Sequence, residues 1–349
     1  MKRVVRDPYS GIDWSSVGRY KANLHAHTTE SDGAQTPVEV VDEYHARGYE
    51  ILAITDHDTY LNRSGIGLST WPWSDFGRDP ERLGMLAVRG NEFTGSPPAG
   101  EMPHLIGLFA ELWRPSDPFS TEQNNVDWIL SELGVRGGLA HWAHPSRSGE
   151  VCVHGDDPQW FLDRHQTHRH LCGFEIHSGS GRETPVQSVD LYDGILTTLR
   201  AAGHELVFSA NAADDSHRAA DIGFDYHVHL MPERSDAALR ASIKAGAYFA
   251  VMDPHGNALG RHICERDGDF YTAAPIIERI KVSDDRIAIT ASQRTRTRWY
   301  TDFGAEIAHD DTLDLRDPDL GKYVRARLEG DSGSLTYTQP WYLEDRDPD

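Results

Sequence analysis

Two histidines separated by one residue, His25 and His27, carry side chains that could bind a metal ion. Side chains alternate between the two faces of a β-strand, so a His-x-His pair on a short strand turns both imidazoles to one side. Asp32 follows on a Ser-Asp-Gly turn, and a later apolar stretch ends in Thr55-Asp56-His57-Asp58. Imidazole is the commonest metal ligand in proteins. Because the chain has 19 histidines, the pair alone is a weak signal, but the pair followed by the second motif favours a metal site.

Further imidazoles and carboxylates lie at or near the ends of other expected strands. The complete candidate ligand set is His25, His27, Asp32, His57, Glu92, His104, His144, Asp215 and His217. This set has no cysteine, exceeds the needs of one tetrahedral zinc ion, and suits two or three divalent cations such as Zn²⁺, Mn²⁺ or Fe²⁺. Metal ions about 3.5–4 Å apart can clamp a phosphoryl group and lower the pKa of a bridging water. The chain has no phosphate-binding GxxxxGKS/T loop and no Gly-x-Ser-x-Gly nucleophile motif.

Alternating strands and helices along residues 20–255 would position these side chains. A helix is expected to begin at Thr36, because Pro37 follows it and Glu39 completes a capping pattern. The strand expected at residues 50–55 is almost continuously apolar, as for a strand buried on both faces. Such alternation predicts a parallel sheet or barrel, and an α/β barrel builds its site at the carboxyl ends of its strands. About seven strand–helix units favour a barrel over an open sheet.

The sequence changes character near residue 256. Helical periodicity disappears there, and short alternating segments predict an antiparallel β module within residues 262–344. We therefore expect an N-terminal lead-in at 1–19, a barrel at 20–255 and a C-terminal β-rich module at 256–349. The module holds few candidate ligands, so the sequence does not indicate its role.

The composition indicates a folded protein and restricts its partners. The net charge of −21 disfavours binding to a phosphate backbone, so we expect a small phosphorylated substrate rather than nucleic acid. The N-terminus lacks a signal-peptide core, and no run approaches the roughly 18 apolar residues of a membrane span. These features favour a cytoplasmic protein that contacts no membrane, and they leave the oligomeric state open. Three cysteines without a CxxC pattern indicate reduced thiols: Cys152, Cys172 and Cys264.

Seven short motifs follow one another along residues 20–255. They are His25-Ala-His27, Ser31-Asp32-Gly33, Thr55-Asp56-His57-Asp58, Gly90-Asn91-Glu92, His104-Leu-Ile-Gly107, Ala143-His144-Pro145 and Asp215-Ser-His217. This series resembles the PHP (polymerase and histidinol phosphatase) family. The resemblance implies a distorted (β/α)7 barrel that acts as a metal-dependent phosphoesterase with a trinuclear centre. The C-terminal part also looks like the β module of some stand-alone PHP proteins.

The resemblance further implies which residues hold each metal ion. The ligands of the first ion would be His25, His27, Glu92 and Asp215. Glu92 would bridge to a second ion, whose other ligands would be His104 and His144. The third ion would be held by Asp32, His57 and His217. A metal-bridged hydroxide would attack phosphorus and the third ion would help to bind the phosphate, so the expected catalytic residues are Glu92, Asp215 and His217.

Three further residues are candidate substrate contacts. Arg147 and Arg182 carry guanidinium groups, which match phosphate bidentately. His177 ends an expected strand, where it is either a substrate contact or an ordinary core residue. Asp214 could compete with Asp215 for the ligand role, but the Asp-x-His spacing favours Asp215.

The remaining histidines have other expected roles. His141 is expected to orient a ligand or to be structural. The pair His227 and His229 has no acidic residue close behind it, so we expect it on a strand surface. A polar, helix-like stretch is expected to expose three more: His165, His168 and His170.

Two other functions stay open at this point. The first is nuclease activity on the ends of short oligonucleotides, which would need a basic groove that the sequence does not indicate. The second is a non-catalytic PHP-like protein that binds metal or ligand, against which the intact ligand series argues.

Overall fold

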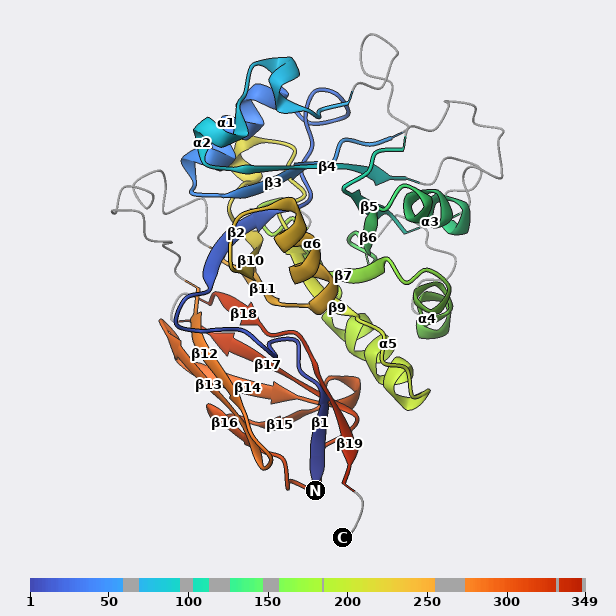
Figure 1. The fold of residues 1–349 in the computed structure, drawn as a ribbon, viewed down its shortest axis with the longest axis vertical. Coiled ribbons are helices and arrows are strands. Elements are labelled where there is room, and N and C mark those ends of the chain that lie inside the picture. The colour runs from blue at the N-terminus through green and yellow to red at the C-terminus, as the bar shows by residue number, and fades with distance from the viewer. Residues whose placement is uncertain are drawn as a thin grey trace.

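The computed structural model describes residues 1–58, 69–94, 103–112, 126–146, 157–183, 185–254, 274–330 and 333–346. An α/β part occupies one end of the molecule, and β1 and the C-terminal strands occupy the other (Figure 1). The helices are α1 (Pro37–Ala46), α2 (Pro80–Leu83), α3 (Val126–Val135), α4 (Pro158–Thr167), α5 (Val189–Ala201) and α6 (Asp236–Ala245). Short 3-10 turns are η1 (Trp73–Phe76), η2 (Ala219–Asp221) and η4 (Asp302–Gly304). No helix in these ranges is both long and apolar enough to cross a membrane.

The strands belong to two groups along the chain. Those before residue 255 are β1 (Lys2–Arg6), β2 (Gly18–Asn23), β3 (Ile51–Ile54), β4 (Leu86–Phe93), β5 (Leu105–Leu108), β6 (Leu139–Trp142), β7 (Leu171–Ser178), β8 (Val186–Gln187), β9 (Ser209–Ala213), β10 (Asp225–Met231) and β11 (Tyr248–Met252). Those after it are β12 (Ile276–Val282), β13 (Arg286–Ser292), β14 (Arg296–Tyr300), β15 (Glu306–Ala308), β16 (Thr312–Asp314), β17 (Tyr323–Glu329), β18 (Leu335–Tyr337) and β19 (Trp341–Asp345).

The α/β part is built on a large, parallel-rich sheet. Strands β2, β3 and β4 run parallel, as do β6, β7 and β9, whereas β5 runs antiparallel to both β4 and β6. Within the described ranges, β9 pairs with β7 but forms no ladder with β10, so the hydrogen-bonded strands do not close into a barrel. The expected α/β class is confirmed, but the expected distorted (β/α)7 barrel is not. Strict alternation fails at β5, which follows β4 with no helix between them in the described chain and reverses direction beside it.

The first helix forms as its capping pattern predicts. The Thr36 hydroxyl accepts a hydrogen bond from the Glu39 backbone N–H, and the Glu39 carboxylate accepts one from the Thr36 N–H. Helix α1 buries Val41 and Tyr44 against the sheet side of the core. The segment that precedes α1, which carries Asp32, is therefore held between a capped helix and the end of β2.

The C-terminal strands form the expected antiparallel module, but they also continue the large sheet. Strand β18 pairs with β11, with Thr336 opposite Val251, and β17 joins β18 to β14 and β19. Strands β12, β13 and β16 form a separate three-stranded sheet. The first residues of the chain, expected as a lead-in, supply β1, which pairs antiparallel with β19.

Four histidines expected at the surface are buried, which corrects those expectations. His227 and His229 point into the protein from β10, where the His227 Nε2 atom accepts the Ala212 N–H and the His229 ring contacts the Ser242 hydroxyl. His165 is buried because the Leu171 carbonyl and the Trp142 indole N–H satisfy both ring nitrogens. The polar composition of this stretch led to the prediction of exposure, and the hydrogen-bond partners that bury His165 cannot be recognised from the neighbouring sequence. The other correction is His168, which is also buried, whereas His170 is half-buried.

We expect two of these histidines, His165 and His229, to destabilise the folded protein at low pH. Burial lowers the pKa of His165 and of His229 to about 3 in each case. Below the unfolded-state pKa of about 6.5 the unfolded chain takes up protons that the folded chain does not, so stability falls as the pH falls towards about 3. From pH 6.5 to 5.0 we expect these two residues to remove about 3 kcal/mol from the free energy of unfolding. Urea unfolding of metal-free protein at both pH values measures this, and equal free energies would contradict it.

Candidate metal centre

The nine candidate ligands meet at one edge of the large sheet. His25 and His27 follow β2, and His57 follows β3. Glu92 lies next to the last residue of β4. An isolated parallel bridge joins His57 to Glu92. His104 precedes its strand, yet it reaches the same edge because β5 runs antiparallel to its neighbours. Thus the carboxyl ends of the parallel strands and the amino end of β5 form one site.

The most buried group of ligand atoms has the spacing of a metal site. His25 Nε2 and His27 Nε2 lie 3.1 Å apart. Each lies 3.0–3.1 Å from Glu92 Oε2 and 3.2–3.4 Å from Asp215 Oδ1. Ligands about 2.0–2.2 Å from a tetrahedral ion lie roughly 3.3–3.6 Å apart, so only a small expansion would admit a cation. All four side chains are at most 4% exposed.

A second group faces the other oxygen of Glu92. His104 Nδ1 lies 2.7 Å and His144 Nε2 lies 3.0 Å from Glu92 Oε1. The carboxylate therefore turns one oxygen to each group, which is the arrangement of a ligand shared by two cations. His57 Nδ1, 3.3 Å from Glu92 Oε2, lies between the groups.

The third group is more open to solvent. Asp32 Oδ2 lies 3.2 Å from His217 Nε2 and 3.5 Å from His57 Nε2. The Asp32 side chain is 30% exposed and that of His217 is 18% exposed. This group therefore lies where solvent reaches the cluster.

Overlapping sets of these atoms also lie within 4.8 Å of one another. His27 joins Asp32, His57 and His217 in one such set. His144 joins His25, Glu92 and Asp215 in a second, and the last contains His57, Glu92 and His104. The three groups thus form one continuous cluster that contains every candidate ligand.

One buried oxygen tests whether the residues fit a metal ion. Glu92 Oε2 has no hydrogen-bond partner among the described residues, although three ring nitrogens lie 3.0–3.3 Å from it. A buried carboxylate oxygen without a hydrogen bond is costly. Three ring nitrogens converge beside this oxygen without forming a hydrogen bond to it, and nitrogen and carboxylate ligands gathered in this way fit a divalent cation.

The electrostatics of the cluster agree with a cation site. Burial lowers the pKa of His27, but Asp215 and Glu92 outweigh it and raise that pKa to about 10. In the same way burial raises the pKa of Glu92 and of Asp215, but the surrounding histidines hold both carboxyl pKa values well below the usual range. The carboxylates thus attract positive charge, which protons supply when cations do not.

Two ligands adopt left-handed backbone conformations. The φ angle is 28° at His144 and 47° at Asp215, a region that non-glycine residues rarely occupy. Strain of this kind clusters at functional sites, where the surroundings must hold it. Of the two adjacent aspartates, Asp215 lies in the cluster. Asp214 instead accepts hydrogen bonds from the backbone N–H groups of residues 223–225.

The candidate substrate contacts lie in different places. Arg182 forms an ion pair with Asp215 and lies beside the cluster. His177 is buried, with its Nε2 atom 2.9 Å from the Tyr337 hydroxyl of the C-terminal module. Arg147 lies outside the described residues.

Sequence reasoning missed Glu175. Its buried carboxylate contacts His25 and His141, as well as the backbone of His144. The only sequence signal was a carboxylate inside an apolar strand, and no motif surrounds it. His141, expected to orient a ligand or to be structural, places its Nε2 atom 3.3 Å from Glu175 Oε1.

Comparison with known proteins relates this fold to that of a solved structure. No family model matches the chain. A two-domain protein from Bacteroides vulgatus, containing a predicted PHP-like metal-dependent phosphoesterase, superposes with a TM-score of 0.55 at 13% identity, covering 99% of this chain and 91% of that one. The chain has a PHP-like fold.

Curated relatives match the PHP-like chain over short stretches. The phosphoribosyl 1,2-cyclic phosphate 1,2-diphosphodiesterase of Eggerthella lenta is 35% identical over 95 residues, 27% of this chain and 32% of the relative. The 5'-3' exoribonuclease of Haemophilus influenzae is 49% identical over 39 residues, 11% of this chain and 14% of the relative. The PHP-like chain thus spans about a third or less of the length of these relatives.

Proposed function

We propose that this protein is a hydrolase that cleaves a phosphate ester, either a small phosphomonoester or a phosphodiester, with two to three divalent cations. The main support is the Glu92 carboxylate, whose two oxygens face separate groups of imidazoles at 2.7–3.3 Å. A carboxylate placed in this way suits two neighbouring cations, and the third group adds a site open to solvent. The fold and the curated relatives, which are named for phosphodiester chemistry, support the same class.

Each group has a proposed part in the reaction. Divalent cations supply Lewis acidity and a water of lowered pKa when they are bound. Glu92 and Asp215 bring negative charge that offsets the cations, and His217 belongs to the exposed group that meets the substrate. Arg182 can donate to a phosphate oxygen, because its guanidinium already lies beside the cluster and is 20% exposed. Arg147 keeps its proposed substrate role on the sequence alone, whereas the buried contact between His177 and Tyr337 favours the core role that the sequence left open for His177.

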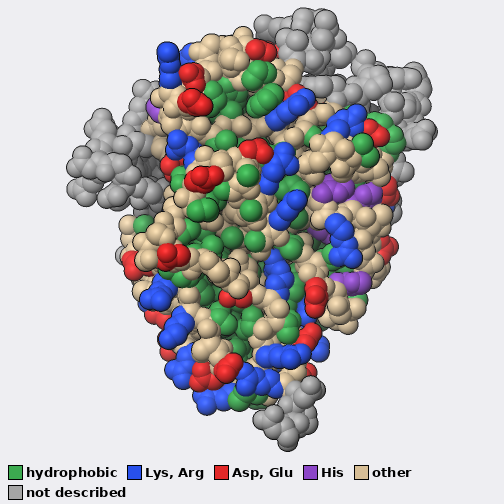
Figure 2. Space-filling view, viewed as in Figure 1, with side chains coloured by type: hydrophobic (Ala, Val, Ile, Leu, Met, Phe, Trp, Pro, Cys, Tyr) green, Lys and Arg blue, Asp and Glu red, His purple; other side chains and the backbone are tan. Residues whose placement is uncertain are grey.

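Charge favours a small substrate over a nucleic acid. Basic and acidic side chains are interspersed at the end formed by the C-terminal strands (Figure 2). Several of the arginines there are ion-paired, including Arg298 with Glu306 and Arg316 with Asp314. These pairs and the net charge of −21 weaken the attraction of a polyanion. Cleavage of short oligonucleotide ends is the second candidate, because one relative is an exoribonuclease.

Metal content and ester hydrolysis test the proposal together. Elemental analysis of the wild type should give about three bound metal ions per chain, and His57→Ala about two, because His57 turns one ring nitrogen to Glu92 and the other to Asp32. The wild type with Mn²⁺ or Zn²⁺ should hydrolyse p-nitrophenyl phosphate or its bis-ester, and which one reacts separates monoesterase from diesterase.

His309→Ala is a matched control. That side chain is 77% exposed and lies outside the cluster, so its removal should leave metal content unchanged. A wild type that binds no transition metal would reject the metalloenzyme. Bound metal without hydrolysis of either ester would favour the non-catalytic reading, and cleavage of a short oligonucleotide alone would favour the nuclease.

A further inference from the structure

Glu175 contacts the metal-ligand cluster from the interior of the protein and is not exposed to solvent. It comes from the middle of β7, and its side chain is fully buried. Its Oε1 atom lies 2.9 Å from His25 Nδ1 and 3.3 Å from His141 Nε2. The Oε2 atom accepts the backbone N–H of His144 at 2.9 Å. One carboxylate thus holds a ligand ring, a ligand backbone and a second imidazole.

The contact with His25 fixes the protonation of the ring. A carboxylate accepts hydrogen bonds, so the His25 nitrogen that faces Glu175 must carry the proton. The other nitrogen, Nε2, which lies beside Glu92 and Asp215, is then the one that can bind a cation. A histidine binds a metal ion through an unprotonated ring nitrogen. A hydrogen bond from its other ring nitrogen to a carboxylate fixes the tautomer and the orientation of the ring.

The contact with His144 holds a strained backbone. With φ at 28°, His144 occupies a conformation that its neighbours must maintain. The hydrogen bond from its N–H to Glu175 joins this residue to β7, and its ring then reaches Glu92 Oε1. Glu175 therefore acts on a second ligand through the main chain rather than through a ring.

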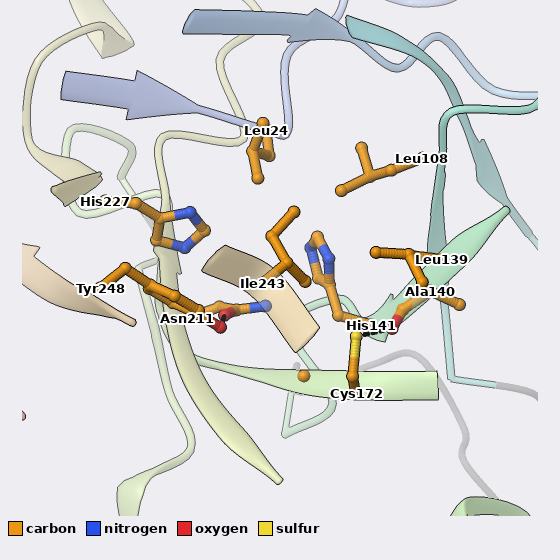
Figure 3. A pocket seen from close by; sticks show the side chains of 11 residues that line it. Leu24, Leu108, Leu139, Ala140, His141, Cys172, Asn211, His227, Ile243 and Tyr248 are labelled. Atoms are coloured by element: carbon orange, nitrogen blue, oxygen red, sulfur yellow. Dashed lines mark hydrogen bonds between the residues drawn. The ribbon is translucent and has the colours of Figure 1, made fainter. Parts of the chain in front are cut away.

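The rear of this arrangement is closed. His141 lies in the wall of a small cavity, together with Asn211, His227 and Cys172 (Figure 3). The cavity has room for about one water molecule. Glu175 and His141 thus lie in an interior without bulk water, where hydrogen bonds are strong and a missing one is costly.

We propose that Glu175 is a positioning residue of the metal centre, which sets the His25 tautomer and the His144 backbone so that both Nε2 atoms face the cations. This inference rests on the metal binding in the proposed function, but not on the reaction or the substrate.

Titration of metal-free protein with Zn²⁺ and with Co²⁺ tests this role. Both carboxylate oxygens of Glu175 face N–H groups, and Glu175→Gln replaces one of these oxygens with an NH₂ group that cannot accept a hydrogen bond. We therefore expect the metal Kd to rise about 10- to 100-fold. The visible absorption of bound Co²⁺, which reports ligand geometry, should change as well. Asp193→Asn is the matched control, because Asp193 is an equally buried carboxylate that contacts Tyr323 and Arg325, away from the cluster. Its Kd and Co²⁺ spectrum should stay at the wild-type values.

The outcomes separate this inference from the proposed reaction. A wild-type Kd and Co²⁺ spectrum in Glu175→Gln would overturn it, and so would a wild type that binds neither metal. Glu175→Asp is the second variant if the first does not fold: its shorter side chain keeps the charge but withdraws the oxygens, and an unchanged Kd there would also overturn the role. A wild type that binds metal but cleaves no phosphate ester would reject the reaction alone, because the Kd comparison needs no turnover.

Discussion

Replacing Glu92 by glutamine should reduce the bound metal from about three ions per chain to about one and lower ester hydrolysis by at least about 10³-fold. Loss of a residue that merely orients a ligand costs about 10- to 100-fold, and Glu92 is proposed to serve two cations directly. The amide offers one neutral oxygen, and its NH₂ group would meet ring nitrogens now 2.7–3.3 Å from the carboxylate. Elemental analysis and the rate with the reactive p-nitrophenyl ester measure the two effects.

Glu111→Gln provides the comparison. Glu111 has a buried carboxyl group, as Glu92 does, but it pairs with Arg89 and Ser69 rather than with imidazoles. This variant should keep the wild-type metal content. If Glu92→Gln retained three ions, or more than a tenth of the activity, the bridging role would be wrong.

Removal of divalent metal should lower the thermal unfolding midpoint by about 7–11 °C. A cation present at 100 times its Kd stabilises the folded state by about 2.7 kcal/mol per site, so two or three sites contribute roughly 5–8 kcal/mol. Without cations, the raised pKa values of His25 and His27 allow protons to replace part of the lost positive charge. The metal-free protein should therefore lose stability but remain folded. Differential scanning with and without a chelator measures the shift.

Two observations would identify the origin of this shift. Adding Zn²⁺ or Mn²⁺ back in excess of the chelator should restore the midpoint. Glu92→Gln, with fewer ions to lose, should respond less to the chelator than the wild type. An equal response of both proteins would place the stabilising metal elsewhere in the chain.

The candidate ligands could be predicted from the sequence because each is tied to a strand end by short-range spacing. His25 and His27 needed only the alternation of a strand, and Asp215 needed only the Asp-x-His spacing. Capping of α1 was equally local, because Thr36 and Glu39 contact each other. Such features depend on residues within a few positions, and the sequence displays them directly.

What could not be predicted depends on contacts between distant strands. Glu175 is 150 residues from His25 and has no neighbouring motif. The reversal of β5 depends on pairing with both β4 and β6, which no local pattern displays. His165 and His229 were expected in solvent because their hydrogen-bond partners come from other elements or from across a turn.

The pairing of β18 with β11 bears on how the protein can be shortened or fused. A chain cut between these strands would leave the backbone of residues 250–252 without its partner, and such an exposed edge invites association with other chains. The same cut would remove Tyr337 from His177, two positions along β7 from Glu175. An isolated α/β fragment is therefore a poor substitute for the whole protein: low solubility and a disturbed centre would be consequences of the cut rather than properties of the enzyme.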